Sequence, residues 1–168
     1  MNNGSNLATL PSAAFSGLAC LETLLLGDTN CAGSLSSLAS CSALKHLNLR
    51  YTKTEGDLKT LCAFPELERL DLTGLSKVRG SIEVLGFLEG LTEIRLQQTC
   101  AEGDIGCFEN LPGLTAVDIS RTVLEGNVAV FKNCEGLMHL SCVANGVDCD
   151  ALGSLKTTLK DCDLIVST

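Results

Sequence analysis

The chain has 168 residues, 45% of them apolar and 19% charged, so it is long enough for one folded domain and too apolar to be disordered. Its net charge of −8 argues against nucleic acid or an anionic membrane as a partner, because both reward a basic surface. No segment reaches the roughly 18 apolar residues of a membrane span, so direct membrane insertion is not expected. The opening MNNGSNLATLPSAAFSG lacks a basic region and a continuous apolar core, so no signal peptide is predicted.

Residues 1–20 are expected to form a half-unit that covers the N-terminal end of the fold. Four apolar residues recur there at helix-like spacing, namely Leu7, Leu10, Phe15 and Leu18. Pro11 suits the first turn of such a helix, and residues 2–5, NNGS, are expected to be loose.

From residue 21 onward the chain repeats itself. A leucine recurs at intervals of 23, 23, 24, 23 and 23 residues, at Leu21, Leu44, Leu67, Leu91, Leu114 and Leu137. A fixed period in this range is typical of a solenoid, in which each unit buries its apolar face only against its neighbours. Residues 21–145 therefore form six predicted repeats within a single domain, 1–168, and the third repeat carries one extra residue.

Each repeat begins with the pattern L-x-x-L-x-L. Its last two apolar positions alternate, which predicts a short strand that points them inward, and successive strands must be parallel. A small polar residue follows three positions later, at Thr29, Thr52, Thr99, Thr122 and Asn145. We expect each of these side chains to hydrogen-bond the backbone of the neighbouring turn, because a buried polar group without a partner is costly. The third repeat has Gly74-Leu75-Ser76 at this point, and its turn should bulge.

A glycine then recurs in every repeat, followed by a residue that favours a helix N-cap. The glycines are Gly33, Gly56, Gly80, Gly103 and Gly126, and the cap residues are Ser34, Asp57, Ser81, Asp104 and Asn127. Recurring glycine indicates a backbone angle that other residues resist, and the cap residues predict a short helix or 3-10 turn on the convex side. Phe64-Pro65 and Leu111-Pro112 should end two of these turns, since proline makes the preceding residue extended.

After Asn145 the pattern weakens, so residues 146–168 are expected to form a degenerate last repeat and a C-terminal edge strand. Asp150 is a candidate N-cap. Leu159, Cys162 and Leu164 repeat the L-x-x-L-x-L spacing, which predicts a seventh strand on an open edge of the sheet.

The ten cysteines contain no C-x-x-C motif, and no metal-ligand spacing involves His46 or His139. Cys31, Cys41, Cys107 and Cys134 align with apolar core positions of other repeats, which favours buried free thiols over disulfides or a metal site. A bridge remains an alternative among three cysteines, Cys142, Cys149 and Cys162. Reduced cysteines favour an intracellular location, cytoplasmic or organellar, over an extracellular one.

These repeats resemble the leucine-rich repeat proteins, whose strand and turn read L-x-x-L-x-L-x-x-N/C-x-L, over about residues 18–147. The G-[SDN]-[LIV] segment is similar to the plant-type subclass, although Thr stands where Asn is usual. The resemblance implies an α/β solenoid: a right-handed superhelix with a parallel concave β-sheet and short helical or 3-10 turns on its convex side. It also implies a protein or peptide partner, usually bound by the concave sheet.

The outward positions of the predicted strands form a nearly neutral face. This face holds six acidic and five basic residues, a net charge of −1, so −7 of the chain's −8 lies elsewhere. Because Tyr and Arg dominate binding hot spots, we predict a protein-binding site there, made of His46, Asn48, Arg50, Tyr51, Arg69, Asp71, Arg95, Gln97, Gln98 and Arg121. The alternative is a solvated sheet whose charges satisfy one another, as in the row Asp71, Arg95 and Asp118.

The sequence contains no arrangement of a nucleophile with a base, no phosphate-binding loop and no metal motif, so no catalytic residue, metal or cofactor is expected. The favoured function is a non-catalytic protein-protein interaction module. Two alternatives remain: a permanent structural or accessory subunit of a large complex, and a fragment of a receptor-like ectodomain.

Overall fold

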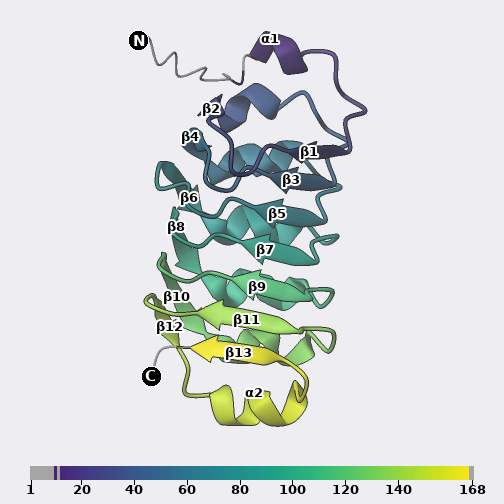
Figure 1. The fold of residues 1–168 in the computed structure, drawn as a ribbon. Helices are drawn as coiled ribbons and strands as arrows, with labels where there is room; N and C mark the ends of the chain where they lie inside the picture. The colour runs from purple at the N-terminus through teal and green to yellow at the C-terminus, as the bar shows by residue number, and fades with distance from the viewer. Residues whose placement is uncertain (1–9, 11, 167–168) are drawn as a thin grey trace.

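The computed structural model describes residues 10 and 12–166 and contains two parallel β-sheets. The first sheet, which we call the concave sheet, has seven strands: β1 (Thr23–Leu25), β3 (His46–Asn48), β5 (Arg69–Asp71), β7 (Glu93–Arg95), β9 (Ala116–Asp118), β11 (His139–Cys142) and β13 (Asp163–Val166). These strands lie in chain order, one per repeat (Figure 1). The prediction of a solenoid with parallel strands is therefore confirmed.

The inward leucine positions of the repeats form one continuous row. Leu47 pairs with Leu70, and Leu70 pairs with Ile94 in the next strand, so equivalent residues lie directly side by side. All three side chains are at most 1% exposed. Each coil thus buries its apolar residues against the equivalent residues of its neighbours, as the 23-residue period requires.

A second sheet, which the sequence analysis did not predict, has six strands: β2 (Ala32–Ser34), β4 (Lys53–Asp57), β6 (Val78–Ser81), β8 (Cys100–Asp104), β10 (Val123–Asn127) and β12 (Gly146–Asp148). It contains the recurring glycines, and Gly56 has a φ of +140°. A Cβ on Gly56 would lie 3.2 Å from the Cβ of Leu35 in the preceding coil. The expected special backbone angle is confirmed, and close packing between coils is a second reason for glycine.

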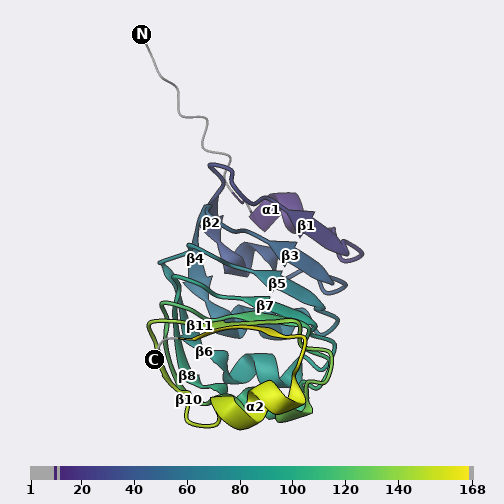
Figure 2. The same cartoon turned by 60° about the horizontal axis from the view of Figure 1, so that its bottom comes forward.

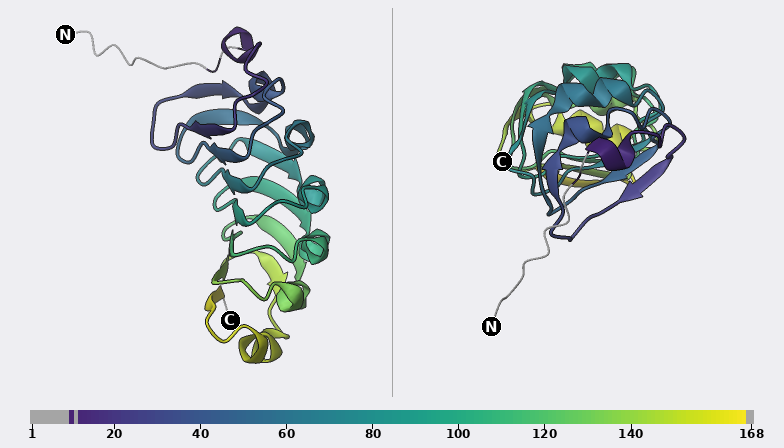
Figure 3. Two further views of the ribbon diagram at one scale, coloured as in Figure 1. Left: turned by 90° about the vertical axis from the view of Figure 1, so that its right-hand side faces the viewer. Right: turned by 90° about the horizontal axis from the view of Figure 1, so that it is seen from above.

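Five 3-10 helices follow the strands of the second sheet: η1 (Leu35–Leu38), η2 (Leu58–Ala63), η3 (Ile82–Phe87), η4 (Ile105–Asn110) and η5 (Val128–Asn133). Each predicted cap side chain accepts a hydrogen bond from the backbone N–H two residues later, as Asp57 does from Lys59 at 2.9 Å. The helices lie on the outer side of a shallow curve, opposite the concave sheet (Figure 3). The predicted convex turns and their caps are confirmed.

The prolines do not set the conformation at the ends of these helices. Phe64, before Pro65, has φ and ψ of −120° and 67°, and Cys134, which no proline follows, has −86° and 68°. In both cases the backbone N–H of this residue donates to a carbonyl three residues earlier. The repeat itself therefore determines this turn.

The recurring threonines bond within their own coil rather than to the neighbouring one, contrary to expectation. Thr52 donates to the Leu49 carbonyl at 2.8 Å and Thr122 to the Ile119 carbonyl at 2.6 Å. Asn145, which has a longer side chain, reaches the Ile119 carbonyl of the preceding coil at 3.1 Å. The Thr side chain is short, so its hydroxyl closes the turn that carries it.

The corner after each concave strand contains a residue in the left-handed region. These residues are Asp28, Tyr51, Gln98, Arg121 and Ala144, with φ between 50° and 60°, and Gly74, with a φ of 78°. In the third repeat Leu75 is buried, and the extra residue delays β6, which starts at Val78. The predicted irregularity of this turn is present.

The N-terminal part contains α1 (Ser12–Phe15), and the side chains of Leu10 and Phe15 are buried against the first coil. Leu18, which was expected to pack with them, is 43% exposed. The expectations for Leu7, Pro11 and residues 2–5 fall outside the described residues.

At the C-terminal end, α2 (Leu152–Thr158) covers the last coil of the stack (Figure 2), and its Leu155 is buried. The last strand differs in register from the expectation, because Leu140 pairs with Leu164 and Cys142 with Val166. Cys162 therefore precedes the strand. Asp150 does not cap α2, which has Ala151 at the N-cap position without a side-chain bond. None of the helices within residues 10 and 12–166 has the length and apolar character to cross a membrane.

Candidate functional site

The ten predicted binding residues all lie on the concave sheet or its corners, with their side chains at least partly accessible. Six are exposed, namely Arg50, Tyr51, Arg69, Arg95, Gln98 and Arg121, and four are half-buried, namely His46, Asn48, Asp71 and Gln97. The strand positions that carry them alternate with the buried leucine row, which explains why they face outward.

A shallow groove of about 320 Å³ brings six of these residues together. We call it the concave groove, and it is lined by Leu25, His46, Asn48, Arg50, Arg69, Asp71, Glu93 and Arg95, with the backbone of the leucine row beneath. Four predicted residues do not line it: Tyr51, Gln97, Gln98 and Arg121. Tyr51, Gln98 and Arg121 are left-handed corner residues, so they lie beyond the ends of the strands.

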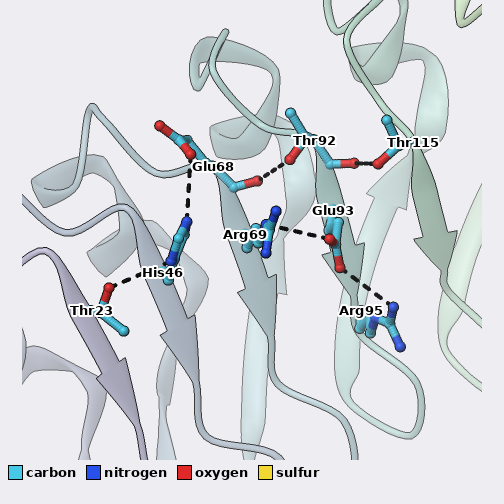
Figure 4. A network of polar contacts seen from close by, with 8 residues as sticks. All are labelled: Thr23, His46, Glu68, Arg69, Thr92, Glu93, Arg95 and Thr115. Atoms are coloured by element: carbon cyan, nitrogen blue, oxygen red, sulfur yellow. Dashed lines mark hydrogen bonds and ion pairs between the residues drawn. The ribbon is translucent and has the colours of Figure 1, made fainter. Parts of the chain in front are cut away.

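Two arginines share one carboxylate at the end of the concave groove formed by β5 and β7 (Figure 4). Arg69 Nε lies 3.4 Å from Glu93 Oε1, and Arg95 Nη2 lies 3.4 Å from Glu93 Oε2. Contacts of this length between half-exposed side chains are weak. Each guanidinium therefore keeps donors available for a carboxylate or a carbonyl of a bound chain.

A second polar chain runs beside this cluster. His46 lies 3.5 Å from Thr23 Oγ1 and, through its other ring nitrogen, 3.5 Å from Glu68 Oε2 (Figure 4). Thr92 donates to the Glu68 carbonyl at 3.0 Å, and Thr115 donates to the Thr92 carbonyl at 3.0 Å. These threonines join the third, fourth and fifth coils next to the cluster of Arg69, Glu93 and Arg95.

Other polar side chains of the concave groove are engaged in local bonds. Arg50 Nε donates to Asp28 Oδ2 at 2.8 Å, and this hydrogen bond raises the pKa of Arg50. Asp71 accepts from the Thr73 backbone N–H at 3.0 Å, and Asp118 accepts from Ser120 in the same way. Asp71 and Asp118 lie on either side of Arg95 in register, but their hydrogen bonds close turns.

Two residues of the concave groove were absent from the predicted set, Leu25 and Glu93. Leu25 is 66% exposed and occupies the same outward column as Asn48 and Asp71. An aliphatic side chain in an otherwise polar column was the sequence feature that could have identified it. The arrangement combines an apolar contact with several guanidinium donors, which suits recognition of a polypeptide.

Of the four cysteines predicted to fill core positions, three are buried and Cys107 is half-buried, whereas Cys20, Cys62 and Cys100 are exposed. All ten are unpaired, and Cys31, Cys41, Cys134 and Cys142 are buried. Burial raises the pKa of Cys107 and Cys142 to about 12 and that of Cys134 to about 11, which suppresses the reactive thiolate. Among residues 10 and 12–166, no three His, Cys, Asp or Glu side chains form a group that could hold a metal ion.

No family model matches the chain, and no curated protein sequence does. Solved structures do match. The leucine-rich repeat ectodomain of the Arabidopsis thaliana membrane receptor kinase GASSHO1/SCHENGEN3, solved with CASPARIAN STRIP INTEGRITY FACTOR 2, is 25% identical with a TM-score of 0.75. The match covers 96% of this chain and 20% of the receptor chain.

Two further matches have the same architecture. The PEPR1–AtPEP1 complex is 25% identical over 96% of this chain and 23% of its own, with a TM-score of 0.78. A plant ice-binding protein is 21% identical, with a TM-score of 0.75 over 99% of this chain and 55% of its own. The chain thus spans only about a fifth of the GASSHO1/SCHENGEN3 and PEPR1 chains, and the fold predicted from its repeats is confirmed.

The predicted intracellular location, cytoplasmic or organellar, is wrong by this comparison. The receptor structures that match are ectodomains, which lie outside the cell, and they point to an extracellular location. The prediction rested on reduced cysteines. Cys31, Cys41 and Cys134 are unpaired because they fill core positions. Their free thiols therefore reflect core packing and do not indicate a cellular compartment.

Proposed function

This chain is a leucine-rich repeat protein, and we propose that it is a non-catalytic interaction module that binds a protein or peptide through its concave sheet. The observation that carries the proposal is the concave groove, where Arg69 and Arg95 share Glu93 and which also includes the exposed Leu25 at its β1 end. Arginine is enriched in binding hot spots, and a neighbouring apolar side chain adds desolvated contact area.

The structural neighbours support this proposal. GASSHO1/SCHENGEN3 was solved in complex with CASPARIAN STRIP INTEGRITY FACTOR 2, and PEPR1 with AtPEP1, so this fold is used for recognition in both proteins. We extend that role to this chain as part of a receptor-like or secreted extracellular protein. A transient interaction fits better than a permanent subunit, because its exposed apolar side chains, such as Leu25, Phe87 and Met138, are scattered along the chain.

The same features argue against catalysis and against nucleic acid. Buried thiols with raised pKa values are poor nucleophiles, and His139 contacts the surface carboxylate of Asp163. The net charge of −8 repels a phosphate backbone.

The proposal is tested by selecting binders for the folded protein from a library of displayed random peptides. Affinities of the enriched peptides are then measured for the wild type and for Arg95→Glu. We expect Arg95→Glu to weaken binding by about tenfold or more, because it removes a guanidinium from the concave groove and adds a repulsive charge.

The matched control is Lys59→Glu, which makes the same charge change at an exposed position of η2 on the convex side. Its affinity should stay within about twofold of wild type. Equal losses in both variants, or no enriched peptide, would contradict the concave groove as the binding site. Circular dichroism checks that each variant keeps its fold.

A further inference from the structure

The extra residue of the third repeat opens the second sheet at one point. β4 and β6 pair at only two positions, Gly56 with Val78 and Asp57 with Arg79, whereas β6 and β8 pair at three. The hydrogen bond from Gly56 N to the Lys77 carbonyl is long, at 3.4 Å. A one-residue insertion in a regular stack must protrude, and insertions in repeat proteins often mark a binding face.

Two hollows flank this insertion. One, of about 530 Å³, is lined on the second sheet by Ser34, Glu55, Gly56, Asp57, Ser76, Lys77, Arg79 and Cys100. The other, of about 320 Å³, lies at the corner and includes Lys53, Gly74, Ser76 and Lys77 in its lining. Ser76 and Lys77 belong to both, so the inserted turn forms a ridge between them. The Cys100 thiol donates to the Ser76 carbonyl at 3.2 Å and holds this turn from the next coil.

The linings of the two hollows hold three basic residues, Lys53, Lys77 and Arg79, against two acidic ones, Glu55 and Asp57, on an otherwise acidic protein. Lys53 and Arg79 are exposed, and neither has an ion pair or a side-chain hydrogen bond within the part of the chain that the structure describes. Lys77 is 74% exposed and contacts Glu55 at 3.6 Å. The strands beyond this point, β8, β10 and β12, carry four acidic residues and no basic one, since their sequences are CAEGD, VLEGN and GVD.

An aromatic ring completes the surface. Tyr51 is 53% exposed, and its ring lies over Gly74, where a Cβ would collide with it. Gly74 also lines the corner hollow beside Lys53 and Lys77. We call Tyr51, Lys53, Ser76, Lys77 and Arg79 the insertion corner.

We propose that the insertion corner is a second binding site, which takes an acidic peptide segment of a partner protein. Carboxylates of the segment pair with Lys53, Lys77 and Arg79, and its backbone lies in the two hollows across Ser76. Charge complementarity selects the occupant, because within the described residues Lys53 and Arg79 have no ion pair and Lys77 has only an exposed 3.6 Å contact with Glu55, whereas the net charge of −8 repels acidic segments elsewhere. The site does not include the concave groove, so it stands apart from the function proposed above.

The test uses a short fluorescein-labelled oligoglutamate peptide and fluorescence anisotropy at low ionic strength. We expect saturable binding that weakens as salt rises, because the cations are exposed. The double variant Lys77→Glu/Arg79→Glu should bind about tenfold more weakly. The control Lys132→Glu/Lys156→Glu has the same net charge at exposed positions far along the chain, and it should stay within about twofold of wild type.

Three outcomes would overturn the proposal. Equal losses in the two double variants would show a response to net charge alone. Loss of oligoglutamate binding in Arg69→Ala/Arg95→Ala would move the acidic segment to the concave groove and leave the proposed function intact. Displacement by inorganic phosphate at similar concentration would identify a simple anion site. Conversely, deletion of Ser76, which restores the 23-residue spacing, should weaken oligoglutamate binding while all three cations remain.

Discussion

Single side chains close the first, second, fourth and fifth coils at two points. A threonine hydroxyl closes the corner after the concave strand, and a cap side chain starts the 3-10 helix. Both groups satisfy backbone atoms that the tight turns would leave without a partner. The repeats vary in most other polar positions, so the threonine bond and the cap bond are the main side-chain hydrogen bonds that the repeat needs.

Replacing a buried threonine should therefore be costly. Thr99 is 5% exposed, and its hydroxyl donates to the Leu96 carbonyl at 2.7 Å. We expect Thr99→Val to lower the free energy of unfolding by ~1–3 kcal/mol, because the carbonyl loses its partner. Urea denaturation measures this. Thr29→Val removes the equivalent bond at an exposed corner and serves as the control. It should lower the free energy of unfolding by less than about half as much as Thr99→Val does.

The cap side chains make a separate prediction. Asp104 accepts from the Gly106 backbone N–H at 2.6 Å. Asp104→Ala should cost ~1 kcal/mol of stability, and Asp104→Asn should be nearly neutral, because Asn127 performs the same role in the next coil. Thermal unfolding followed by circular dichroism compares the two. A loss in the Asn variant as large as in the Ala variant would show that charge, not capping, matters.

The buried thiols predict a dependence on alkaline pH. An unfolded thiol ionises near pH 8.5, whereas burial raises the pKa of Cys107 to about 12 and of Cys134 to about 11. Above about pH 8.5 the unfolded state thus binds fewer protons than the folded state, and the free energy of unfolding falls as pH rises. Urea unfolding at a series of pH values measures the slope. Cys134→Val should show a shallower fall than wild type.

The 3-10 helices stack on one another along the convex side and cover the core from outside. Phe108 of η4 and Phe131 of η5 are fully buried, with ring centroids 6.0 Å apart and an angle of 34° between the rings. Their tilted contact joins two elements that are each too short to be stable alone. The helices therefore depend on their neighbours for stability.

A double-mutant cycle can measure this dependence. Phe108→Leu and Phe131→Leu should each destabilise the protein, and the two losses should differ from additivity by ~0.5–1.5 kcal/mol because the rings touch. Chemical denaturation of the four proteins gives the coupling. Additive losses would mean that each ring is held by the core alone.

The whole molecule is a linear stack in which each coil contacts its neighbours in sequence. The first coil is less well covered than the others, since Leu21, Leu24 and Leu26 are only partly buried, whereas the equivalent residues of the central repeats are fully buried. Stability should thus be greatest in the middle and decline toward the ends.

This gradient is testable by comparing equivalent strand residues. Ile94→Ala, in β7, should cost ~2–5 kcal/mol, because it leaves a cavity in the leucine row. Leu24→Ala, in β1, should cost less than about half of that, because its site is already partly open. Native-state hydrogen exchange should show slower exchange in β5 and β7 than in β1. Uniform exchange along the stack would contradict the gradient.

The repeats made most of this architecture predictable from the sequence. Leucine spacing predicted the concave strands, and glycine followed by a cap residue predicted the convex turns, because each pattern recurs at a fixed interval. The second sheet was missed since its strands are short and glycine-containing, as in KTEGD of β4, and only their pairing makes them strands. Whether a threonine bonds its own coil or the neighbouring one depends on the length of its side chain, and the spacing of the repeats in the sequence does not reveal this.

The candidate site was predictable only in part. The outward columns identified His46, Asn48, Arg50, Arg69, Asp71 and Arg95, which line the concave groove. Tyr51, Gln98 and Arg121 were placed beside them, but their left-handed corners carry them past the strand ends. Glu93 occupies the same outward column as His46 and Arg69, but only the structure shows that it contacts Arg69 of the adjacent strand and Arg95 of its own strand.

The threonine bonds affect how easily the number of repeats can change during evolution. The hydroxyls of Thr52 and Thr122 bond a carbonyl of their own coil, so these bonds remain intact when a neighbouring coil is lost. Unequal crossing-over between gene segments can then add or remove a whole unit without breaking the bond that closes the corner of the remaining units. Thr92, Thr115 and Asn145 reach back to the preceding coil instead, so an exchange at their junctions would break a side-chain bond.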